Sequence, residues 1–302
     1  MENITISKNR LIEDLKNLGI KKGDIINMKV SLKSIGKIEG GVTTLIDAIL
    51  EIIGEDGAIM TESFIKMVPK WKLNRKNPSH FSNEKSLSYA GAFTNEVLKH
   101  PKAIIGNHPT HRYAGIGVKI KDIIESHNVN NDPYLVLEAF ANLGGKNLRI
   151  GPKEKVVGVG TTHIAINKSK LRQKRPKAGL YYYQNGEIKV FENWWATGCE
   201  KAFNKIIENF KGTDAIINEG KIGNADSLLT NMSRTLEIEN QLIRCNPKNI
   251  LCDDTSCPKC QIAWEFNKGN SMKCILSNIK RKNIKGVLSC IYYIFNTNYL
   301  PK

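Results

Sequence analysis

A strand, a glycine-rich loop and a helix follow one another in DIINMKVSLKSIGKIEGGVTTLIDAILEII, residues 24–53. Residues 24–30 are a short apolar run, which predicts a buried strand. Residues 31–41 form a polar loop, and the apolar run from Thr43 to Ile53 predicts a helix that ends at Gly54. A second short strand is expected at residues 58–60. Together these segments indicate an α/β fold.

The same alternation of strands and helices continues through the first 160 residues. It predicts three layers, α/β/α, with helices on both faces of a mixed central sheet. We assign residues 1–244 to this domain and residues 245–302 to a small Cys-rich basic extension. Residues 65–88 are expected to be a long functional loop. The other predicted elements are helices at 8–18, 91–100, 119–126, 134–143, 199–210 and 232–244, strands at 103–105, 147–150 and 156–159, a hairpin 180–191 around Asn185-Gly186, and strand and turn at 214–230.

The composition is that of a globular protein with an excess of positive charge. Hydrophobic residues make up 41% of the 302 residues and charged residues 25%, which excludes wholesale disorder. Lys and Arg number 45 against 29 Asp and Glu, a net charge of +16. This field attracts phosphates, nucleic acids and anionic lipids, although the codon bias of an AT-rich genome would produce the same excess. The sequence shows no signal peptide and no apolar stretch near the roughly 20 residues that span a bilayer, so we expect a cytoplasmic protein.

Two polar loops follow predicted strands, the position at which open α/β sheets bind ligands. In the first, Ser31 to Gly36 is followed by Gly40-Gly41 and a helix. Backbone N–H groups at such a helix start suit a phosphate, or the glycines serve a plain turn. In the second, His108 and His111 flank Pro109. They form a metal pair, or one bonds the loop backbone while the other is exposed.

A third loop, Gly158 to His163, ends in a histidine at a predicted strand-to-helix junction. A histidine there can act as a general base near neutral pH.

Five motifs occur in one order between residues 8 and 243. They are Leu18-Gly19-Ile20 with Gly23-Asp24, Ser31 to Gly36 with Gly40-Gly41, Gly91 to Pro101, the whole of Asn107-His108-Pro109-Thr110-His111, and Gly220 to Ala225. Together they resemble the aminoglycoside 3-N-acetyltransferase family. The resemblance implies an acyltransferase that binds acetyl-CoA and a small-molecule amine together and transfers the acetyl group directly.

The resemblance also implies a role for each loop. One histidine removes a proton from the attacking amine, and Gly, Ser and Thr donors stabilise the charge on the thioester oxygen. The implied catalytic residues are His163 as base, Thr162 and His111. The residues implied to bind the cofactor are Ser31, Ser34, Gly36, His108 and Thr110.

The chain departs from the family pattern at five positions. Lys29, Val30, Arg112 and Gly160 stand where the family has His, Ser, Ser and Thr. The family's glutamate three residues past the base is Ile166. That carboxylate would orient the imidazole and stabilise its charged form, as the aspartate of a protease triad does. Glu192 or another carboxylate is a candidate replacement, and loss or redirection of activity is the alternative.

The charge also bears on the acceptor. Aminoglycosides are polycations, which a protein at +16 repels, whereas it attracts the phosphates of CoA. We therefore expect the amine to belong to an amino sugar of a cell-surface polysaccharide or a related metabolite, rather than to the antibiotic.

Four cysteines, Cys245, Cys252, Cys257 and Cys260, lie within sixteen residues as C-x6-C-x4-C-x2-C. Spacings of two to four residues are typical of tetrahedral zinc sites, and disulfides are unexpected in the cytosol. The pattern predicts a structural zinc ion, with reduced cysteines or an iron–sulfur cluster as alternatives. The other three cysteines, Cys199, Cys274 and Cys290, are expected to be buried or incidental thiols.

Residues 268–302 are basic and end in an apolar run from Val287 to Phe295. This run is a terminal helix that docks on the core, or an attachment to a membrane surface or a partner. Three further functions compete with acetyl transfer: a nucleic-acid-binding protein, a metal hydrolase using His108, His111 and His163, and a non-catalytic CoA-binding relative. The basic residues are spread along the chain without a recognition motif, so nucleic acid is not expected. A homo-oligomer remains open.

Overall fold

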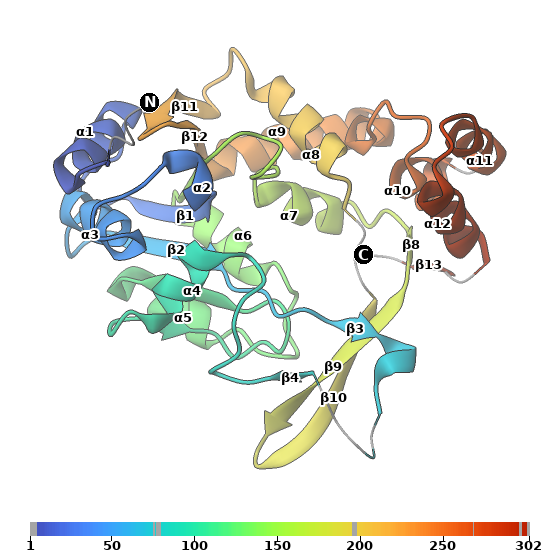
Figure 1. The fold of residues 1–302 in the computed structure, drawn as a ribbon, viewed down its shortest axis with the longest axis horizontal. Helices are drawn as coiled ribbons and strands as arrows, with labels where there is room; N and C mark the ends of the chain where they lie inside the picture. Colours follow the sequence, from blue (N-terminus) through green and yellow to red (C-terminus); the bar gives the residue numbers. More distant parts are fainter. Residues whose placement is uncertain are drawn as a thin grey trace.

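A mixed seven-stranded sheet forms the centre of the molecule (Figure 1). The computed structural model describes residues 5–74, 76, 80–194, 198–267, 269–295 and 298–300. The central strands are β1 (Ile25–Val30), β2 (Ala58–Glu62), β5 (Ile104–Ile105), β6 (Tyr113–Ile116), β7 (Lys146–Ile150), β11 (Ile216–Ile222) and β12 (Ala225–Asn231). Their order is β11-β12-β7-β1-β2-β6-β5. β1 pairs in parallel with β2 and β7, while β6 runs antiparallel to β2 and β12 antiparallel to β7.

Helices cover both faces of this sheet, which confirms the three-layer α/β/α prediction. Neighbouring strand residues enter different cores because side chains alternate across a strand. Ile26 and Ile59 pack in the core that includes α1 (Lys8–Leu18), α3 (Val42–Ile53) and α4 (Ala92–Lys99). Ile25 and Met60 pack in the other core, which includes residues of α5 (Lys121–Glu125), α6 (Leu135–Asn142), α7 (Thr161–Lys168), α8 (Glu200–Ile207) and α9 (Met232–Cys245).

The predicted helix at 8–18 shows how local sequence sets an element. Leu11, Leu15 and Leu18 are buried at helical spacing on α1. The helix begins where the Ser7 hydroxyl accepts a hydrogen bond from the backbone N–H of Arg10, at 3.3 Å. It ends at Gly19, whose φ of 103° is left-handed.

A long hairpin projects from the main body at the bottom of Figure 1. It consists of β9 (Lys177–Gln184) and β10 (Glu187–Trp194), joined as predicted at Asn185-Gly186, both with positive φ. The expected loop at 65–88 contains two short strands, β3 (Val68–Pro69) and β4 (Phe81–Ser82), that pair with β9. Backbone pairing with the hairpin orders these parts of the segment.

The strand predicted at 156–159 is wrong, because these residues form a loop that leads into α7. Gly158 has a φ of 61°, which lies outside the range of a regular β-strand. A Cβ atom at Gly158 would also lie 3.0 Å from Phe203 of α8. The close approach of α8 therefore bends the segment out of the sheet.

The C-terminal residues add the 3-10 helix η4 (Pro247–Ile250) and the helices α10 (Pro258–Gln261), α11 (Ser271–Lys280) and α12 (Ile284–Phe295). α11 and α12 pack around a small core that contains Cys274 and Cys290. β13 (Asn298–Leu300) pairs with β8 (Gln173–Arg175), which ties this part of the chain to the rest. Ile284 and Leu288 of α12 are exposed. Within the described residues, every helix is too short or too polar to cross a bilayer.

Candidate functional site

His163 lies in the first turn of α7, at the end of the loop that replaces the predicted strand. Its ring stacks on Tyr134 with centroids 4.9 Å apart and planes 4° apart, and it meets Phe203 edge-on at 4.9 Å. The imidazole borders a cavity of about 120 Å³ that Thr110, His111 and Tyr134 also line. The Thr110 hydroxyl lies 3.0 Å from Nδ1 of His111. The structure thus brings three of the residues singled out from the sequence to one cavity.

Thr162 is not among the described residues that line this cavity. Its buried hydroxyl donates a 2.5 Å hydrogen bond to Oε1 of Glu239 on α9, and the hydroxyl of Thr161 lies 3.0 Å from that of Thr235. Burial raises the pKa of Glu239 to about 8, and the threonine hydroxyls lower it in part. Thr162 therefore links the start of α7 to α9, whereas the resemblance implies a catalytic role for it.

His108 organises the loop before β6. Its Nδ1 accepts the backbone N–H groups of Thr110, at 3.1 Å, and of His111, at 3.0 Å. Burial, with smaller contributions from His111 and His127, lowers its pKa to about 3, so the ring is neutral and carries its proton on Nε2. With Nδ1 occupied by two donors, the geometry argues against a metal pair of His108 and His111. In the part of the chain that the structure describes, no histidine belongs to a cluster of three or more His, Cys, Asp or Glu side chains that could hold a metal ion.

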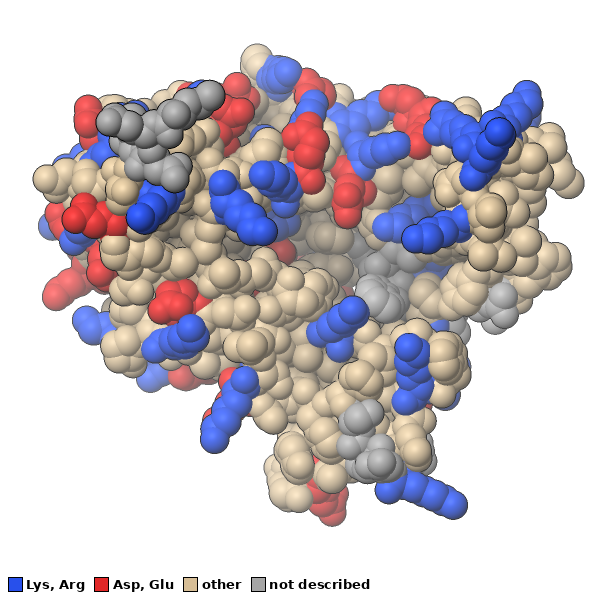
Figure 2. All heavy atoms as spheres, in the orientation of Figure 1, with Lys and Arg blue, Asp and Glu red and all other residues tan. Residues whose placement is uncertain are grey.

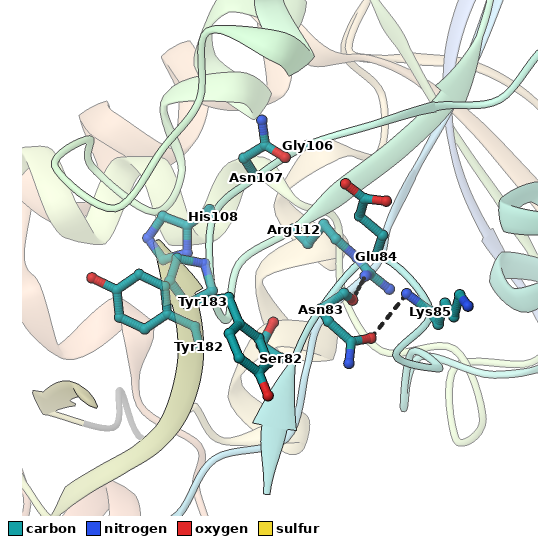
Figure 3. A pocket seen from close by; sticks show the side chains of 11 residues that line it. Ser82, Asn83, Glu84, Lys85, Gly106, Asn107, His108, Arg112, Tyr182 and Tyr183 are labelled. Atoms are coloured by element: carbon teal, nitrogen blue, oxygen red, sulfur yellow. Dashed lines mark hydrogen bonds between the residues drawn. The ribbon is translucent and has the colours of Figure 1, made fainter. Parts of the chain in front are cut away.

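A larger cavity of about 490 Å³ lies on the His108 side of the same loop (Figure 3). Tyr182 and Tyr183 of β9 and Asn83 form part of its wall. Arg112, which replaces the family's serine, closes another part. Its guanidinium donates to the carbonyl of Asn83 at 2.8 Å, the carbonyl of Ser86 at 2.5 Å and the hydroxyl of Ser63 at 3.2 Å. Arg112 therefore fastens residues 83–86 to the end of the central sheet.

The first predicted cofactor loop follows β1. The hydroxyls of Ser31 and Ser34 lie 2.9 Å apart, and residues 32–35 form a single helical turn, α2 (Leu32–Ile35). Gly36 has a φ of 107°, and a Cβ atom there would lie 2.8 Å from the side chain of Asn224. Gly36 thus serves the turn and its packing against the β11–β12 connection, while the two serines remain half-buried at the end of β1.

Glu62 is a carboxylate of the site that the sequence analysis missed. It ends β2 and is only 8% exposed, and its Oε2 lies 3.6 Å from Nζ of Lys29. Its Oε1 is buried without a hydrogen-bond partner in the described structure, and it lies 3.2 Å from where a Cβ atom of Gly160 would be. Glu62 therefore faces the start of α7, the helix that carries His163. Its place at the carboxyl end of a parallel strand is the signal that could have identified it.

The two positions considered from the sequence, 166 and 192, do not supply a carboxylate next to the start of α7. Ile166 is buried at 2% exposure in the core, so nothing at that position replaces the family's glutamate. Glu192, the expected substitute, lies on β10 and pairs with Nζ of Lys70 at 2.8 Å. Of these three positions, Glu62 is the carboxylate that the described structure places facing the start of α7, the helix that carries His163.

The cysteines gather differently from the expectation. The sulfur atoms of Cys199, Cys252, Cys257 and Cys260 lie within 4.8 Å of one another. Cys245 is exposed at the end of α9 and does not belong to this group. Cys199, expected to be a buried or incidental thiol, is buried and takes the fourth place, because the chain folds back and brings the start of α8 to the loop that contains the other three cysteines.

Comparison with known families agrees with the fold and the loops. The family model for aminoglycoside 3-N-acetyltransferases matches residues 28–244. The chain belongs to the aminoglycoside 3-N-acetyltransferase family.

Similar individual proteins are divergent. Aminoglycoside N(3)-acetyltransferase IX of Micromonospora chalcea is 25% identical over 134 residues, 40% of this chain and 48% of that protein. Aminoglycoside N(3)-acetyltransferase III of a Salmonella species is 26% identical over 221 residues, 68% of this chain and 74% of that protein. The matched part therefore spans about half of the first of these relatives.

Solved structures share the fold. The sisomicin-bound acetyltransferase AAC-VIa has a TM-score of 0.70 at 20% identity and covers 80% of this chain and 98% of its own. The complex of AAC-IIIb with CoASH has a TM-score of 0.68 at 17% identity, with 80% of this chain and 97% of its own covered.

Proposed function

We propose that this protein transfers an acetyl group from acetyl-CoA to an amine of an aminoglycoside-like compound or amino sugar. The observation that carries the proposal is the position of His163 in this chain, which belongs to the family. His163 lies on the first turn of α7 and borders a cavity together with Thr110 and His111. The relatives named above act on aminoglycosides, and one related structure holds CoASH.

His163 is the proposed general base. The amine nitrogen attacks the carbonyl carbon of the thioester and forms the C–N bond, while the imidazole takes a proton from the nitrogen. The C–S bond then breaks, and CoA leaves as a thiolate that takes up a proton. The Thr110 hydroxyl is a candidate donor to the thioester oxygen during attack. His108, neutral and bonded through Nδ1, holds the loop that presents Thr110 and His111.

The acceptor proposed is an anionic amino sugar or related metabolite. Figure 2 shows Lys and Arg spread across one face, with Asp and Glu among them. The net charge of +16 disfavours polycations at long range, and the mixed pattern on this face offers no continuous basic stripe for a nucleic acid. Reduced cysteines and acetyl-CoA both suit the cytoplasmic location proposed for this chain.

A thiol-release assay with acetyl-CoA over a panel of amino sugars and aminoglycosides tests this function. General-base catalysis contributes about 100-fold or more, so His163→Ala should lower kcat/KM by at least that factor. The matched control His100→Ala changes a histidine outside the cavity and should retain activity. Equal rates for His163→Ala and the wild-type protein would disprove the base assignment. Efficient turnover of gentamicin or kanamycin would contradict the narrower choice of an anionic amino sugar as acceptor and would leave acetyl transfer itself supported.

A non-catalytic CoA-binding relative is the second candidate. The observation that favours it is at position 166, where a buried isoleucine stands in place of the family's glutamate. The proposed base therefore has no carboxylate from this position. Saturable CoA binding with no thiol release across the panel would identify this function.

A further inference from the structure

Three separate segments bring four sulfur atoms together outside the proposed active site. Cys199 is the residue before α8, and Cys252 follows η4. Cys257 is the residue before α10, and Cys260 lies within that helix. All four are free thiols, three of them buried and Cys257 half-buried. Cys199 is 9% exposed, and it comes from a part of the chain more than fifty residues before the other three.

The distances between the sulfur atoms fit ligands of one metal ion better than they fit a disulfide bond. Zn–S bonds of about 2.3 Å in a tetrahedron place the sulfurs about 3.8 Å apart. The Sγ atoms of Cys199 and Cys257 are 3.7 Å apart, and all four fall within 4.8 Å. A disulfide would need about 2.05 Å.

The surroundings suit a group of thiolates. The backbone N–H of Cys252 donates to Sγ of Cys260 at 3.3 Å, as outer hydrogen bonds to metal-bound sulfur do. Nζ of Lys201 on α8 pairs with Asp254, in the loop between the cysteines, at 2.6 Å. Asp254 in turn accepts from the Ser256 hydroxyl at 2.7 Å, which orders the loop between the cysteines.

We propose that Cys199, Cys252, Cys257 and Cys260 bind one structural zinc ion. Four cysteines complete a tetrahedral shell and leave no position open for a substrate, so the site is structural rather than catalytic. The residues around α11 and α12 share a core of only a few side chains, and such small units usually need a metal or another staple. The zinc ion joins this part of the chain to α8.

The proposed zinc site is also connected to the proposed active site through α8. α8 carries Phe203, which packs edge-on against the ring of His163, and Asn204, whose Oδ1 accepts the backbone N–H of Gly158 at 3.2 Å. Zinc bound to Cys199 fixes the residue immediately before α8, and thereby the helix that holds the loop leading to His163.

Metal analysis of the full chain, purified without added zinc, tests the proposal. We expect about one zinc per chain in the wild-type protein and less than half an equivalent in Cys199→Ala. The matched control Cys245→Ala should keep the full equivalent, because Cys245 lies outside the group although it is adjacent in the sequence. Less than half an equivalent of any metal in the wild-type protein, or iron in place of zinc, would overturn the proposal. Loss of zinc from Cys245→Ala with retention in Cys199→Ala would overturn the ligand set.

Because Cys199→Ala could fail to fold, a second measurement uses the wild-type protein. Cobalt exchanged into the site should give the intense visible bands of tetrahedral thiolate coordination. Labelling with a thiol reagent should modify Cys245 first and the four ligand cysteines only when zinc is released. Labelling of Cys199 before any zinc release would contradict the assignment.

Discussion

Replacement of Glu239 by glutamine is expected to change how the stability of the protein depends on pH. Glu239 is 1% exposed on α9, and its Oε1 accepts the Thr162 hydroxyl at 2.5 Å. Burial raises its pKa to about 8, with the threonine hydroxyls acting in the opposite direction. The carboxyl group is therefore protonated in the folded protein at neutral pH, and glutamine reproduces the shape of this neutral form.

The sign and size of the effect follow from proton linkage. In the unfolded chain the group ionises near 4.5, whereas in the folded protein it ionises near 8. Between these values the folded state holds one proton more than the unfolded state, so stability falls as the pH rises. At about 1.4 kcal/mol per pH unit, the loss reaches up to roughly 5 kcal/mol by pH 8 and then levels off.

Denaturant unfolding of the wild-type protein and of Glu239→Gln between pH 5 and pH 9 measures this effect. The difference in unfolding free energy should grow with pH in favour of the glutamine variant. Glu237→Gln is the matched control, since Glu237 lies on the same helix but is exposed and pairs with Arg234. Parallel stability curves for the wild-type protein and Glu239→Gln would refute a buried, neutral Glu239.

Two further substitutions test the wall of the larger cavity and the missed carboxylate. Arg112→Met removes three hydrogen bonds from a buried cation, each worth about 1.5–3 kcal/mol, and should lower Tm by at least about 6 °C. As the control, Arg244→Met at an exposed position should leave Tm nearly unchanged. Equal Tm values for the two variants would contradict the claim that Arg112 fastens residues 83–86 to the sheet. Glu62→Gln should lower kcat/KM for acetyl transfer by about tenfold, because it removes the negative charge that pairs with Lys29 and faces the start of α7. Glu192→Gln is its control, and equal kcat/KM values for the two variants would count against a role of Glu62 in the site.

The pattern of apolar residues was sufficient for most of the fold. The helix over residues 8–18 was predicted because Leu11, Leu15 and Leu18 recur at helical spacing and Gly19 ends the run. The hairpin was predicted because Asn185-Gly186 adopts the positive φ angles that its turn requires. The strand at 156–159 was wrong, because its apolar residues suited a strand while the packing of Phe203 against Gly158 decided the backbone.

The sequence by itself determined the layers, the family motifs and the types of chemically active side chain, since these depend on local spacing and composition. Only the tertiary structure decided which of those side chains meet. It placed His163, His111 and Thr110 at one cavity, directed Thr162 towards Glu239 and brought Glu62 to the start of α7. It also exchanged Cys245 for Cys199. The physical reason is that a site joins residues far apart in the chain, and their distances depend on how helices and strands pack rather than on their separation in sequence.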